Sequence, residues 1–190
     1  MKLTSRIATA GFLLLATGIC GCAGWGAHEP DQYFVLEAAA GHRPAVTGVQ
    51  VGPTTAAAFY DTQDIVFSRS TGTRAYYRYH HWTERPQRAV RAMLLERFDS
   101  TGRPPRFEIE TSVEEIYHDA AEAPGTARIT VNAQLVDLAT REIVARRTFT
   151  AAAPASSYDA AGAVHGFSQA LGLLLDDMAA WAGSRPAAGR

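Results

Sequence analysis

The spacing of apolar and polar residues changes several times along the 190-residue chain, and each change predicts a different element. Short runs of β-forming residues predict four strands, which we place at 32–37, 46–51, 65–67 and 73–79. Gly52-Pro53 is expected to close the second strand with a turn, and Gly72 is expected to mark a bend between the last two.

Two segments have helical spacing instead. From Pro86 the apolar positions recur three and four residues apart, which predicts an amphipathic helix with Thr83 as its N-cap. A longer apolar stripe near the end of the chain predicts a second helix, capped by Ser156 or Ser157 and ended at Gly183. Both helices have a polar side, so each is expected to pack one face against a sheet.

Between these helices the period drops to two, so one side of each predicted strand is apolar and the other is polar. The three runs lie at 107–114, 128–135 and 142–150. A turn over 137–141 joins the last two runs into a hairpin, and all three form an antiparallel meander. We expect a bulge near Leu135, because Val136 breaks the alternation.

The polar side of the first meander strand is acidic. Glu108, Glu110 and Glu114 share this side, and arginines such as Arg128 or Arg146 on the following strands oppose them. We interpret these residues as a solvated surface.

Together these elements predict an α+β fold. We expect a single domain over residues 31–183, in which a mainly antiparallel sheet carries two principal helices packed against it. The 47% hydrophobic content is ample for one core, and residues 184–190 are expected to form a disordered tail.

The first residues have the order of a bacterial export signal. Lys2 and Arg6 precede an apolar run over 7–19, which is too short for a spanning helix of about 20 apolar residues. The run ends in Ile19-Cys20-Gly21-Cys22, which resembles the lipobox cut by lipoprotein signal peptidase. We therefore predict a signal peptide over 1–21, lipidation of Cys22 and a lipidated tether over 22–30.

The sequence offers two alternatives to this cleavage site. Cleavage at Cys20 would put Thr17 at the aliphatic position and bulky Ile19 where a small residue is needed, so Cys20 is assigned to the discarded peptide. An ordinary secretory signal cut after a small residue would instead leave Cys22 as a free thiol.

Lipidation at Cys22 has several consequences. The mature chain then has one cysteine, which is consumed by lipid, so an internal disulfide is excluded. Acyl chains such as palmitate are the covalent anchor, and no other cofactor is expected. Because Ala23 rather than aspartate follows the lipidated cysteine, we predict a periplasm-facing protein anchored to the outer membrane.

Composition and motif spacing argue against several other functions. The formal net charge of −1 gives no electrostatic basis for nucleic-acid binding. A metal site is not expected, because His80 and His81 are adjacent and face opposite sides of a strand, and the other histidines are scattered. The sequence has no Gly-x-Ser-x-Gly elbow, so we name no catalytic residue and predict that the protein is not an enzyme.

The segment 74–82 interleaves aromatic and cationic residues more densely than any other part of the chain. Tyr77, Tyr79 and Trp82 are the candidate partner-binding residues in this segment. The alternative is a structural strand that leads into the first helix and buries half of its side chains.

The chain resembles the ABC-type transport auxiliary lipoproteins, also called the PqiC-like group. The resemblance spans nearly the whole mature region and rests on the order and spacing of segments 32–36, 49–53, 64–66, 76–82, 133–137, 140–144 and 167–171. The chain departs from the family pattern at 54–60 and at 114–117.

The resemblance implies a periplasmic accessory of an intermembrane lipid-transport system. Such systems pair an ATPase and a permease with an MCE-domain protein that carries lipid, and the lipoprotein receives or docks that protein. The chain has no phosphate-binding glycine loop, so ATP hydrolysis is not expected of it. A structural or assembly lipoprotein of the cell envelope is the alternative, and association into a homo-oligomer is left open.

Overall fold

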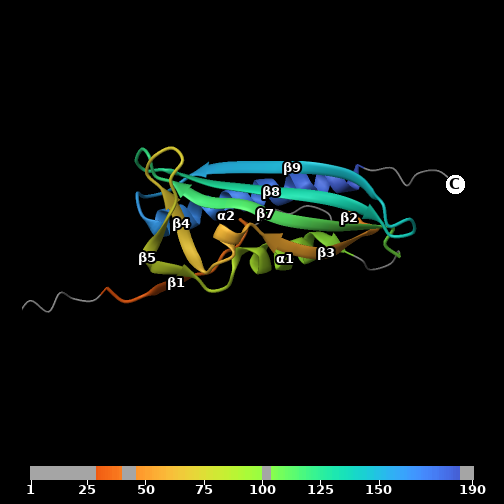
Figure 1. The fold of residues 1–190 in the computed structure, drawn as a ribbon, viewed down its shortest axis with the longest axis horizontal. Helices are drawn as coiled ribbons and strands as arrows, with labels where there is room; N and C mark the ends of the chain where they lie inside the picture. Colours follow the sequence, from red (N-terminus) through yellow and green to blue (C-terminus); the bar gives the residue numbers. More distant parts are fainter. Residues whose placement is uncertain (1–28, 40–45, 100–103, 185–190) are drawn as a thin grey trace, which may run out of the picture. The chain divides into compact units, whose positions relative to one another are not determined.

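A computed structural model describes residues 29–39, 46–99 and 104–184 (Figure 1). The predicted signal peptide, Cys22 and most of both the tether and the C-terminal tail lie outside the described residues. Residues from Asp31 onward form one compact unit. In the described part of the chain, neither α-helix combines the length and the apolar character that crossing a bilayer requires.

The predicted strands and helices are present with shifted bounds, but the strand predicted at 46–51 is divided into two, and an unpredicted short strand follows the first long helix. The strands are β1 (Gln32–Phe34), β2 (Val46–Thr47), β3 (Val49–Ala56), β4 (Asp64–Ser68), β5 (Ala75–Trp82), β6 (Phe98–Asp99), β7 (Phe107–Asp119), β8 (Thr126–Asp137) and β9 (Ile143–Pro154). The helices are the short η1 (Ala58–Tyr60), α1 (Pro86–Arg97) and α2 (Ala160–Gly183).

The main sheet has the order β1-β5-β4-β7-β8-β9, with β3 paired to β7 beside β4. Strands β7, β8 and β9 form the predicted antiparallel meander. The pairs β1–β5, β3–β7 and β4–β7 are parallel, so the sheet is mixed. The α+β class is confirmed, and the parallel pairs are the feature that local patterns did not predict.

Helix α2 packs its apolar stripe against one side of the meander (Figure 1). Phe167 and Trp181 make edge-to-face ring contacts with Trp82 and Phe149, each with centroids 5.5 Å apart. At Gly166 the helix comes so close to the sheet that an added Cβ would lie 2.9 Å from the Cβ of Ala127. Gly166 therefore allows a close approach that a larger residue would block.

Both helix N-caps differ from the prediction. Helix α1 begins at Pro86, and its N-cap is Arg85, which makes no side-chain capping bond, so Thr83 lies outside the helix. The N-cap of α2 is Asp159, whose carboxylate accepts from the Gly162 N–H at 2.7 Å. A carboxylate accepts the same capping hydrogen bond as a serine would, and its charge adds a favourable interaction with the positive end of the helix.

The second predicted strand does not stop at Gly52-Pro53. Strand β3 continues through both residues to Ala56, and its register with β7 shifts between Val51 and Thr54. Proline is tolerated here because the irregularity relieves it of a ladder hydrogen bond. The bulge predicted near Leu135 is confirmed by a register shift between Leu135 and Val136.

The contact between α2 and the sheet generates a stability prediction. Phe167 is fully buried, so Phe167→Ala should lower the free energy of unfolding by about 3–5 kcal/mol. The control is Leu173→Ala on the same helix, where 58% of the side chain is exposed and the change should stay within about 0.5 kcal/mol. Urea denaturation measures both, and equal losses would contradict this account of the core.

Candidate functional site

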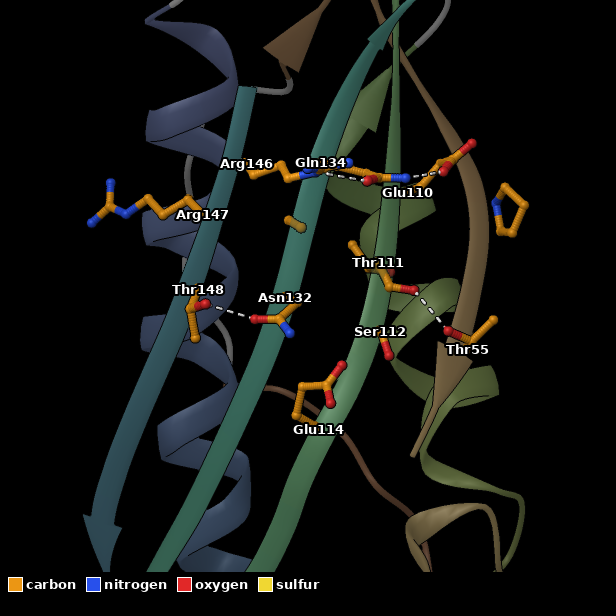
Figure 2. A pocket seen from close by; sticks show the side chains of 12 residues that line it. Thr55, Glu110, Thr111, Ser112, Glu114, Asn132, Gln134, Arg146, Arg147 and Thr148 are labelled. Atoms are coloured by element: carbon orange, nitrogen blue, oxygen red, sulfur yellow. Dashed lines mark hydrogen bonds between the residues drawn. The ribbon is translucent and has the colours of Figure 1, made fainter. Parts of the chain in front are cut away.

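The side of the sheet opposite α2 carries a groove of about 680 Å³ (Figure 2). Four strands contribute to it, namely β3, β7, β8 and β9. Its lining residues are mainly hydroxyl, amide and charged side chains: Pro53, Thr55, Glu110, Thr111, Ser112, Glu114, Asn132, Ala133, Gln134, Arg146, Arg147 and Thr148. The polar side of the meander is therefore concave here.

Hydrogen bonds between side chains cross the floor of the groove from strand to strand (Figure 2). Arg146 Nε donates to Gln134 Oε1 at 3.4 Å, and Gln134 Nε2 donates to Glu110 Oε2 at 2.5 Å. In parallel, Thr148 Oγ1 donates to Asn132 Oδ1 at 2.6 Å. These bonds hold the polar side chains in place, which lowers the entropy lost when a ligand or partner binds.

Two charged residues of the groove do not belong to this hydrogen-bond network. Glu114 makes no hydrogen bond or ion pair with any other residue that the structure describes. The guanidinium of Arg147 points away from the groove in Figure 2 and lies 4.7 Å from the centroid of the Phe149 ring. Inside the groove, Glu110 and Glu114 therefore outnumber the single cation of Arg146.

The three glutamates predicted to share one face do so, with partners other than those expected. Glu108 accepts from Gln50 Nε2 at 2.6 Å, and Glu110 accepts from Gln134. Arg146 reaches this group only through Gln134, and Arg128 instead pairs with Asp119 at 2.9 Å.

The lining of the groove offers carboxylate, amide, hydroxyl and guanidinium groups and contains no histidine or cysteine. Among the described residues, no group of three or more histidine, cysteine, aspartate or glutamate side chains is arranged to hold a metal ion.

The structure separates the three predicted partner-binding residues. Trp82 is 1% exposed and packs on Phe167, so we remove it from the predicted contact surface, because a core side chain offers no area to a partner. Tyr77 and Tyr79 are half-buried on β5. Whether they contact a partner stays a prediction.

Tyr77 takes part in a buried polar contact that the sequence did not suggest. Its hydroxyl lies 2.7 Å from Nδ1 of the fully buried His118, and His118 Nε2 lies 3.2 Å from the carbonyl oxygen of Pro124. Because a carbonyl only accepts, Nε2 carries the proton and Nδ1 accepts from Tyr77. Burial raises the pKa of Tyr77 to about 12, so its hydroxyl stays protonated as this bond requires.

The same burial acts in the opposite direction on His118. Desolvation lowers the pKa of His118 below its usual value. The bond to Pro124 and the nearby carboxylates of Asp119 and Asp159 favour the charged form and raise the pKa, but their effect is smaller. His118 is therefore a neutral structural residue that links β5 to β7.

Comparison with known proteins gives one family match. The model of the family described as "ABC-type transport auxiliary lipoprotein component" matches residues 34–179. No curated protein matches the chain.

Two solved structures share the fold. The crystal structure of protein XCC0632 from Xanthomonas campestris, assigned to the DUF330 family, superposes with a TM-score of 0.69 at 22% identity, covering 80% of this chain and 94% of that one. The crystal structure of an uncharacterized protein superposes with a TM-score of 0.63 at 12% identity, covering 81% of this chain and 99% of that one. At these identities the likeness concerns the fold.

His118 generates a prediction about pH. Burial lowers the pKa of His118 in the folded protein relative to the unfolded chain, so protonation favours unfolding. The free energy of unfolding should therefore be highest above about pH 6.5. It should fall as the pH drops toward the folded pKa, by at most about 1.4 kcal/mol per pH unit. The variant His118→Gln keeps a donor and an acceptor but does not titrate. Denaturation at pH 7.5 and 5.5 should show a larger loss for the wild type, and equal losses would contradict the assignment.

Proposed function

The chain belongs to the family of ABC-type transport auxiliary lipoprotein components, and from this premise we propose that it docks the lipid-carrying partner of an intermembrane transport system at the outer membrane. The observation that carries the proposal is the family match, which spans 34–179 and thus nearly the whole described domain. The partner would be an MCE-domain protein, and the cargo of the whole system would be phospholipid.

The anchor in this proposal is the lipid on Cys22. The export signal, the lipobox-like Ile19-Cys20-Gly21-Cys22 and the family's lipoprotein character all support it. Ala23 supports the outer membrane as the destination. Restricting a binding domain to a membrane surface raises its effective concentration beside a partner there, so contacts of modest affinity suffice.

The docking surface in this proposal is the polar groove. Its hydrogen-bonded floor supplies fixed amide and hydroxyl groups, and the carboxylate of Glu114 is free to pair with a cation of the partner. A polar, preorganised surface of this kind suits a reversible contact, since obligate interfaces are larger and more hydrophobic.

The anchor can be tested with the two cysteines of the leader. Cys22→Ser should abolish lipidation and move the protein from the membrane to the soluble periplasmic fraction, because its acyl chains are lost. Cys20→Ser is the matched control and should leave the protein in the outer membrane. Cell fractionation with mass spectrometry measures both, and release by Cys20→Ser alone would contradict the assignment of Cys22.

The docking surface can be tested by photo-crosslinking in cells. A photo-crosslinking residue in place of Asn132, in the groove, should capture an MCE-domain protein. The same residue in place of Gln169, exposed on the far side of α2, is the control and should capture little or none. Capture of an outer-membrane barrel or a cell-wall synthase would contradict the transport role and favour the assembly alternative.

A further inference from the structure

A second surface lies at the β1–β5 end of the sheet and is aromatic rather than polar. We call it the aromatic patch and define it by four side chains, of which Tyr33 is 61% exposed, Val35 55%, Tyr76 42% and Phe59 40%. They belong to β1 and the residue after it, to η1 and to β5. Apolar side chains of this size are normally scattered singly on a surface, so their concentration near one end of a sheet calls for an explanation.

Strand pairing places Tyr33 and Tyr76 on neighbouring strands at the β1–β5 edge of the sheet. Tyr33 pairs with His81 on β5, and Tyr76 of β5 pairs with Val66 on β4. The register between β4 and β5 shifts between Asp64, which pairs with His81, and Val66.

Contacts with neighbouring side chains fix the rings of the patch at two places. The rings of Phe59 and Tyr76 stack with centroids 4.9 Å apart, and the Tyr76 hydroxyl donates to the Phe59 carbonyl oxygen at 3.2 Å. The Tyr33 ring lies 5.4 Å from that of His81.

The charged groups around the patch fit a phospholipid surface. The carboxylates of Asp64 and Asp31 lie 2.9 and 3.8 Å from the ring nitrogens of His81. Arg69 and Arg78 are exposed, and their guanidinium carbons each lie 5.2 Å from a ring centroid, that of Phe67 and that of Tyr79. Neither arginine forms an ion pair with any residue that the structure describes. Exposed arginines beside aromatic rings are typical of a surface that meets lipid headgroups.

The length of the chain between Cys22 and β1 also favours contact between the patch and a phospholipid surface. Ten residue steps separate Cys22 from Gln32, so β1 lies at most roughly 35 Å from the anchored sulfur even at full extension. β1 is the first strand of the domain and carries Tyr33 itself. A lipid on Cys22 therefore limits how far β1 can lie from the bilayer, and it does so for β1 more closely than for any later strand.

We infer that the aromatic patch rests on the phospholipid surface of the membrane that anchors the protein, as a second contact that orients the domain. The inference depends on the proposed function, because it requires the anchor at Cys22. Tyrosine rings, which have an apolar body and a polar edge, are enriched at the level of the lipid headgroups in membrane-bound proteins. The contact turns a flexible attachment into a defined orientation.

The test uses the mature lipoprotein in vesicles of phosphatidylethanolamine and phosphatidylglycerol. Because Cys22 carries the lipid, an added cysteine is a unique labelling site. Ala75→Cys, exposed beside the patch, would carry an environment-sensitive fluorophore, and Asn132→Cys and Gln169→Cys are the control sites. Lipids with a quencher in the headgroup should quench the Ala75→Cys label several-fold more than either control.

A triple variant separates the patch from simple closeness to the tether. Tyr33→Ser, Phe59→Ser and Tyr76→Ser together should remove the excess quenching at Ala75→Cys, with an unchanged circular dichroism spectrum verifying the fold. Tyr76→Ser alone should reduce it and serves if the triple variant does not fold. Equal quenching at all three sites, no effect of the serine variants, or energy transfer showing that a second copy covers the patch would overturn the inference.

Vesicle flotation distinguishes failure of the oriented membrane contact from failure of the proposed function. A chain that floats with the vesicles but shows equal quenching at every site keeps its anchor and loses only the oriented contact. A chain that does not float lacks the anchor, which overturns the proposed function together with this inference.

Discussion

Burial of the apolar stripe of α2 against the β7–β9 meander is the interaction on which the rest of the structure depends. Large side chains of α2 such as Phe167 and Leu171 are fully buried there, and each such burial is worth about 1.5–3 kcal/mol. Gly166 allows the helix to approach the strands closely. Because the helix covers only one side, the other side of the same strands is left polar and open, and the groove forms on it.

This one-sided arrangement separates stability from binding. Changes on the helix side affect folding, whereas Asn132, Gln134 and Thr148 on the open side can change without opening the core. The groove and the aromatic patch also use different strands, with the groove on β3 and β7–β9 and the patch on β1, β5 and η1. A tethered domain can therefore meet its membrane and its partner with different surfaces.

The sequence predicted those parts of the fold that local periodicity determines. The meander, the bulge at Leu135 and helix α2 follow from period-two and helical spacing, and the polar side of the groove strands was visible in the same alternation. The parallel pairing of β3 and β4 with β7, and the contact of Tyr77 with His118 across 41 positions, could not be predicted, because tertiary packing selects partners far apart in the sequence. The burial of Trp82 could not be predicted either, because period alone does not say which half of an aromatic strand is buried.

In the proposed function, this domain is a docking module for an MCE-domain protein. Isothermal titration of the detergent-solubilised mature lipoprotein with that protein tests it most directly. We expect saturable binding that weakens as salt is added, because the carboxylate of Glu114 in the groove pairs with a cation of the partner and salt screens this attraction. The absence of saturable binding at about 100 μM of either protein would contradict the account, since even a weak tethered contact should be detectable there.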